Sequence, residues 1–136
     1  MGQQQILMLV LGIVLVSVAV YIGMDFFSEM LRQRHVDLIV NHAIHVASEA
    51  VSWRIKGSTY LGGGESYSDL DTDGMAKLLM ASERIPGTFE ITTANGDDLE
   101  VTGVSMEFPE IGIRVVVEGQ EIVDTIIAYD GSIALP

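Results

Sequence analysis

The chain lacks cysteine and is short of basic side chains, and each shortage excludes a class of protein. Without cysteine in its 136 residues, the chain cannot form disulfides, thiolate metal sites or a cysteine nucleophile. Its 7 Lys and Arg stand against 19 Asp and Glu, for a formal net charge of −12. Because an acidic surface repels phosphate backbones, we expect no nucleic-acid partner.

Charged residues are absent from the first 24 positions, and the stretch from Ile6 to Met24 is almost wholly apolar. As an α-helix, these 19 residues span about 28 Å, close to the hydrocarbon thickness of a bilayer. No Lys or Arg precedes the stretch, and residues 25–29 do not resemble a small-x-small cleavage site. Both absences argue against a removable secretory signal, so we expect residues 1–24 to remain as a transmembrane helix.

Helix breakers are also scarce, because no proline precedes Pro86 and no glycine lies between Met24 and Gly57. One helix can therefore continue from the apolar segment through residues 25–56. From residue 6 to 56 it would measure about 76 Å, more than a small domain can cover. Its apolar half thus needs lipid or copies of itself. The other half carries an apolar stripe at steps of three and four residues, formed by Val36, Ile39, Val40, Ala43, Val46, Ala47, Ala50 and Val51.

The rest of the chain is predicted to form a loop, a short helix and a sheet. A Gly/Ser-rich loop is predicted over 57–68 and a short helix over 72–84, which Pro86-Gly87 ends. From Thr88 the apolar period changes to two, which is typical of strands. The strands predicted within 88–130 are 88–93, 98–108, 111–118 and 121–129, and Asn95-Gly96 predicts a tight turn between the first two. We therefore predict an α+β fold, in which a long N-terminal helix packs its amphipathic half on an antiparallel sheet of about four strands within a globular domain, residues 25–136.

This layout resembles that of type IV pilins. Shared features are a short polar N-terminus, an uninterrupted apolar helix, an amphipathic continuation, a variable loop and an antiparallel sheet. The resemblance covers the whole chain as architecture and residues 1–56 as sequence character. It implies a structural subunit of an extracellular, cell-surface filament, built as a helical homopolymer. It also implies a membrane-inserted precursor that meets the inner membrane and the pilus assembly machinery, and a peptidase that cuts after Gly2.

The chain departs from the pilin pattern near its start. Pilins usually carry a basic leader, a mid-helix proline and a glutamate as fifth mature residue, whereas this chain has Gln5 there when counted from Met1. Cleavage after Gly2 would put Leu7 at that position. Without the proline, Gly12 and Gly23 are the residues that could loosen the helix. The residues expected to pack against equivalent helices are Gln5, Ile6, Leu7, Leu9, Val10, Gly12, Ile13, Val14, Val16, Val20 and Gly23.

Two groups of side chains could hold a metal ion. Asp69, Asp71 and Asp73, followed by Gly74, match the first half of a calcium loop, but Met80 stands where the bidentate glutamate is needed. The alternative is an acidic loop that caps the helix beginning near Thr72. His42, His45 and Glu49 share one helix face at a spacing that suits zinc, or they are simply solvated.

Enzymatic activity is not expected, because the chain has no nucleophile motif and its three histidines all lie on the long helix. We therefore predict a filament subunit with no required cofactor. The alternatives are a single-pass, membrane-anchored binding module outside the cell and a pseudopilin of a secretion system.

Overall fold

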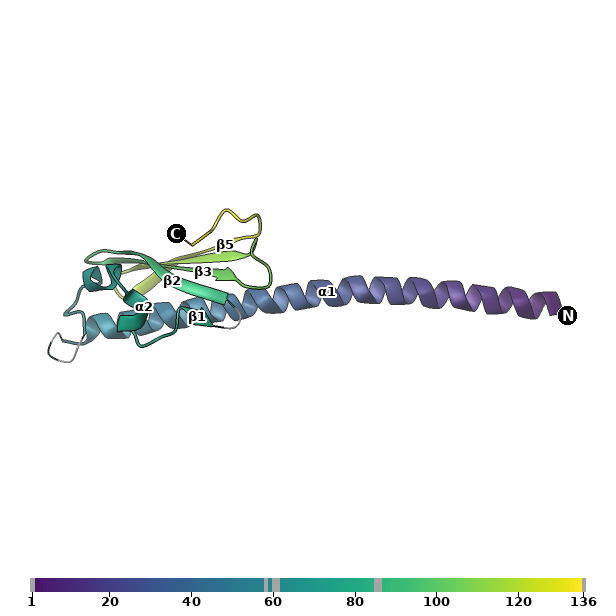
Figure 1. Ribbon diagram of the computed structural model, residues 1–136, viewed down its shortest axis with the longest axis horizontal. Helices are drawn as coiled ribbons and strands as arrows, with labels where there is room; N and C mark the ends of the chain where they lie inside the picture. Colours follow the sequence, from purple (N-terminus) through teal and green to yellow (C-terminus); the bar gives the residue numbers. More distant parts are fainter. Residues whose placement is uncertain (1, 58, 60–61, 85–86, 136) are drawn as a thin grey trace. The chain divides into compact units, whose positions relative to one another are not determined.

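A computed structural model describes residues 2–57, 59, 62–84 and 87–135 (Figure 1). The N-terminal helix is α1 (Gly2–Ile55), and two short helices follow, η2 (Ser68–Asp71) and α2 (Gly74–Lys77). The strands are β1 (Glu83–Arg84), β2 (Gly87–Ala94), β3 (Asp98–Ser105), β4 (Gly112–Glu118) and β5 (Glu121–Ala128). The predicted α+β class is confirmed.

The chain divides into two compact units, residues 1–34 and 35–136. This division falls after Arg34, not after Met24 as the sequence predicts. The reason lies in burial along α1. Residues 25–31 are still exposed, and Val36 is the first buried residue of the helix.

In the first unit, the side chains of α1 have no core to enter, and residues 2–31 are all exposed. The two serines of this part satisfy their hydroxyls within the helix itself. Ser17 Oγ donates to the carbonyl of Ile13 at 2.8 Å, and Ser28 Oγ donates to that of Met24 at 3.0 Å. These bonds to the preceding turn let a hydroxyl sit in an apolar helix without exposing an unsatisfied donor.

In the second unit, the strands form an antiparallel meander in the order β1-β2-β3-β4-β5. The four long strands confirm the predicted sheet. The turn between β2 and β3 holds the predicted Asn95-Gly96 pair, where the backbone N–H of Asn95 donates to the backbone carbonyl of Asp98 at 2.8 Å. The turn between β4 and β5 uses Gly119 at φ +64°, a backbone conformation that favours glycine.

The helix predicted over 72–84 is wrong beyond Lys77, because α2 covers only Gly74–Lys77. Leu79 adopts φ +58°, which stops the helix, and Glu83–Arg84 pairs with β2 as the edge strand β1. Pairing with a neighbouring strand thus overrides the local helical pattern. The expected side-chain cap is also missing: Asp73 precedes α2 at φ 52° and caps no described residue through its side chain.

One face of the sheet and the apolar stripe of α1 form the core of the second unit. Alternate residues of β3 and β4 point toward the helix, as the period of two predicts. Small alanines in the middle of the stripe let the helix lie close to the sheet. The buried residues of the helix are Val36, Ile39, Ala43, Val46, Ala47, Ala50 and Trp53, and those of the sheet include Phe89, Leu99, Val101, Ile113, Val115 and Val117.

A substitution at Gly103, which lies opposite the ring of Phe89, tests this packing. Gly103 of β3 pairs with Phe89 of β2, and a Cβ on Gly103 would lie 2.5 Å from two ring carbons of that fully buried side chain. We expect Gly103→Ala to lower the free energy of unfolding by about 1–3 kcal/mol. Urea unfolding in detergent, followed by the fluorescence of Trp53, the only tryptophan, measures the change.

Gly96→Ala is the matched control, because no described atom lies within 4 Å of a Cβ added at Gly96. We expect that variant to stay within about 0.5 kcal/mol of the parent. Equal losses of stability in both variants would contradict the proposed packing of Gly103 against Phe89.

Candidate functional site

The most unusual surface of the protein is the apolar stretch of α1, residues 6–24, which we call the apolar surface. Its large side chains are between 51% and 77% exposed. Every residue predicted for helix assembly, from Gln5 to Gly23, is exposed. Gly2, the predicted processing position, is exposed at the start of α1.

Water is a poor environment for this surface. Burying one large aliphatic or aromatic side chain is worth roughly 1.5–3 kcal/mol, and the apolar surface presents many of them together. Among the residues that the structure describes, α1 is the one helix long and apolar enough to cross a membrane. The chain therefore needs lipid or another protein around residues 6–24.

Gly12 opens a shallow hollow on the apolar surface. The hollow has a volume of about 440 Å³. No described atom lies within 4 Å of a Cβ added at Gly12, so the helix backbone is open to a neighbour there. Small residues permit close approach between helices in lipid. The lining residues are Met8, Leu9, Gly12, Ile13, Val16 and Ser17.

The residues predicted to bind zinc lie in different environments. The His42 ring lies with its edge toward Phe89, with ring centroids 4.4 Å apart, and so belongs to the contact between helix and sheet. The His42 and His45 rings are 6.2 Å apart, while His45 and Glu49 are exposed. Within the described ranges, no group of three or more His, Asp or Glu side chains could hold a metal ion.

The predicted calcium residues are likewise not gathered around one point. Asp69 and Asp71 lie on η2 and Asp73 precedes α2, and all three are exposed. The Asp69 carbonyl accepts a hydrogen bond from Lys77 Nζ. Asp71 and Asp73 instead line a hollow of about 440 Å³ together with Glu90 of β2. The described residues therefore do not form the predicted calcium loop.

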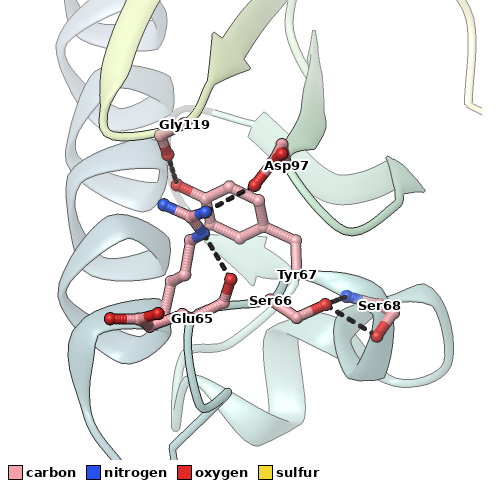
Figure 2. Close-up of polar contacts among 7 residues, drawn as sticks. Glu65, Ser66, Tyr67, Ser68, Asp97 and Gly119 are labelled. Atoms are coloured by element: carbon pink, nitrogen blue, oxygen red, sulfur yellow. Dashed lines mark hydrogen bonds and ion pairs between the residues drawn. The ribbon is translucent and has the colours of Figure 1, made fainter.

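A polar cluster that the sequence analysis missed lies at the C-terminal end of α1 (Figure 2). The buried Tyr67 donates its hydroxyl hydrogen to the Gly119 carbonyl at 2.5 Å. Arg54 donates from Nη2 to Asp97 Oδ1 at 2.5 Å and from Nε to the Glu65 carbonyl at 3.1 Å. The Arg54 guanidinium carbon lies 5.2 Å from the centre of the Tyr67 ring, a cation–π distance. The cluster joins the helix end to two turns of the sheet.

Three consecutive glycines, Gly62–Gly64, which we call the glycine triplet, lie at the same end of α1. The Gly63 amide donates to the Trp53 carbonyl at 3.0 Å, and the Gly64 amide donates to the Lys56 carbonyl at 3.0 Å. These bonds satisfy carbonyls that the end of a helix leaves without partners. A Cβ on Gly63 would lie 2.4 Å from the Trp53 ring, so the close approach requires glycine. Gly63 and Gly64 therefore cap the end of α1.

Comparison of the chain with models of known protein families, with curated proteins and with solved structures found no match. Fold and site define its class: an α+β protein whose N-terminal helix exposes a membrane-length apolar surface. The resemblance to pilins stays a prediction.

Removing the Tyr67 hydroxyl tests the polar cluster. We expect Tyr67→Phe to cost about 1 kcal/mol of unfolding free energy near neutral pH, because one hydrogen bond is lost. Burial raises the pKa of Tyr67 above its ordinary 10.0, with a further rise from Asp97 and an opposing effect of Arg54. A raised pKa in the folded state means that the hydroxyl stabilises the fold fully below pH 10 and less as pH rises through that pKa.

Unfolding free energies of both proteins at about pH 8 and about pH 11 measure this effect. The difference between Tyr67→Phe and the parent should shrink at the higher pH. A difference that stays constant or grows would show that the Tyr67 hydroxyl is not buried as described.

Proposed function

We propose that this chain is the structural subunit of a type IV pilus-like extracellular filament, assembled through the apolar surface of α1. One observation carries the proposal: the same helix contributes buried residues to a protein core over residues 36–53, whereas every residue from 6 to 24 is exposed. A folded unit attached to such a helix can move from lipid into a bundle of identical helices. Lipid and the helix bundle both keep the same apolar side chains out of water.

The partners in this proposal are other copies of the chain, and before assembly the inner membrane and the assembly machinery. In lipid, helices gain little from hydrophobic association, so close packing at small residues supplies the contact. The open backbone at Gly12 supports this route. Ser17 borders the same hollow and adds a small side chain.

A second candidate function is a membrane-anchored binding module outside the cell, or a pseudopilin. The hollow lined by Asp71, Asp73 and Glu90 favours the module, because its carboxylates would attract a cationic ligand. In this case the apolar surface would serve only as an anchor. Changes at Gly12 would then leave the protein's behaviour unaltered.

A charge inside the apolar surface tests the filament proposal. We expect Val14→Asp to abolish filaments, because an unpaired carboxylate cannot enter an apolar bundle. The yield of chain in material sheared from the cell surface, measured by immunoblot, reports assembly. Met106→Asp is the matched control, because Met106 lies in the second unit and is 52% exposed, like Val14.

Gly12→Leu separates assembly from membrane insertion, since it leaves the segment apolar and fills the hollow. We expect normal amounts in the membrane fraction and at least about a tenfold loss from the sheared fraction, the equivalent of 1.4 kcal/mol. Val18→Leu adds bulk to an exposed apolar residue that neither lines the hollow nor belongs to the residues predicted for assembly, and should assemble normally. Normal filaments from both Val14→Asp and Gly12→Leu would refute the proposal.

A further inference from the structure

The last strand of the sheet leaves apolar side chains in water. β5 pairs with β4, and no described strand pairs with its other edge. Ile122 is 39% exposed, Val123 50% and Ile126 43%. An apolar edge strand with free backbone groups is a surface that another chain can cover.

A groove runs beside the start of this strand. It has a volume of about 460 Å³ and is lined by Ser48 and Val51 of α1 together with Gln120, Glu121 and Ile122. We call the groove and the exposed residues of β5 together the β5 edge. Val51 and Ile122 supply its apolar lining, and its volume leaves room for inserted side chains.

The β5 edge also carries negative charge. Glu118 and Glu121 lie directly opposite each other across β4 and β5, and both are exposed. Like charges at opposite positions destabilise a sheet. Asp124 follows on the same strand, and the sequence has no Lys or Arg from Val115 to its end. A cation from outside this part of the chain would relieve the repulsion, whereas an anionic membrane would increase it.

The chain itself contains a segment of the complementary kind. Residues 26–34 have the sequence Phe-Phe-Ser-Glu-Met-Leu-Arg-Gln-Arg, and both of its arginines lie at its C-terminal end, after the acidic Asp25 and Glu29. Phe26, Phe27 and Met30 are at least 60% exposed. The segment follows the uncharged stretch of α1, so burial of residues 6–24 in a filament core leaves these aromatic side chains uncovered.

We propose that residues 26–34 of one copy dock on the β5 edge of a second copy. Phenylalanine side chains then cover Ile122 and Val123, and the exposed Arg34 approaches Glu121 and Glu118. The inference rests on the proposed filament and adds a contact outside its helical core. Because each copy offers both surfaces, the contact is head-to-tail and can propagate along a polymer.

Engineered cysteines test this contact directly, since the chain has none of its own. Full-length Phe27→Cys/Val123→Cys is expressed in cells, oxidised, and separated without reductant from both the sheared and the membrane fractions. A head-to-tail contact joins every copy to two others, so we expect a ladder of multimers. The matched control is Phe27→Cys/Glu83→Cys, because Glu83 is exposed on β1 at the opposite edge of the sheet, and it should give no ladder.

Charge reversal shows whether the contact has the proposed chemistry. We expect Glu121→Arg in the double-cysteine background to reduce the ladder roughly tenfold, because like charges then face each other. Adding Arg34→Glu should restore the ladder. Loss of cross-linking in Glu121→Arg without recovery in the combined variant would overturn the role of Arg34.

The outcomes for the contact and for the filament are separate. Filaments without a ladder would overturn the docking of residues 26–34 and leave the proposed function standing. A ladder in the membrane fraction without filaments would support the contact and overturn the filament. Dimers from Val123→Cys alone, with no ladder from the pair, would overturn the proposal in favour of two β5 strands that pair with each other.

Discussion

The structure depends on one constraint: nineteen uncharged residues at the start of α1 must be kept out of water. Their large side chains are more than half exposed. Because each is worth roughly 1.5–3 kcal/mol on burial, the stretch is unfavourable until lipid or protein surrounds it. The first unit has no core of its own that meets this requirement, because residues 2–31 are all exposed. We therefore interpret residues 6–24 as the functional surface of the protein.

The second half of α1 differs from the first, because its apolar stripe is buried against the sheet. Ala43, Ala47 and Ala50 are completely buried, and the sheet closes over them with Phe89, Val101 and Val115. Arg54 and Tyr67 then connect the end of the helix to two turns of the sheet (Figure 2). The amides of Gly63 and Gly64 bond back to carbonyls at the helix end. A single helix thus serves as core on one side of Arg34 and as an uncovered apolar surface on the other.

Local periodicity made most of this fold predictable. The switch from steps of three and four to steps of two located the sheet, and Asn95-Gly96 located its first turn. The two failures have different causes. Glu83–Arg84 pairs with Thr88 and Gly87, which follow it closely in the chain, so strand pairing replaced a local helical pattern. Tyr67 lies in a Gly/Ser-rich loop, and its partner Gly119 is distant in the chain, so no local pattern encodes that contact. The assembly residues could be named from apolarity alone, and their partner remains a prediction.

The surroundings of residues 6–24 in the cell decide between a filament core and a simple anchor. Cryo-electron microscopy of material sheared from cells, with mass spectrometry of the same fraction, observes them directly. We predict thin filaments composed mainly of this chain, with a central bundle of helices into which Ile6–Met24 can be built. The mass of the N-terminal peptide would also show whether the chain is cut after Gly2. A chain found only in the membrane fraction, with lipid around the same residues and no filaments, would contradict the proposal.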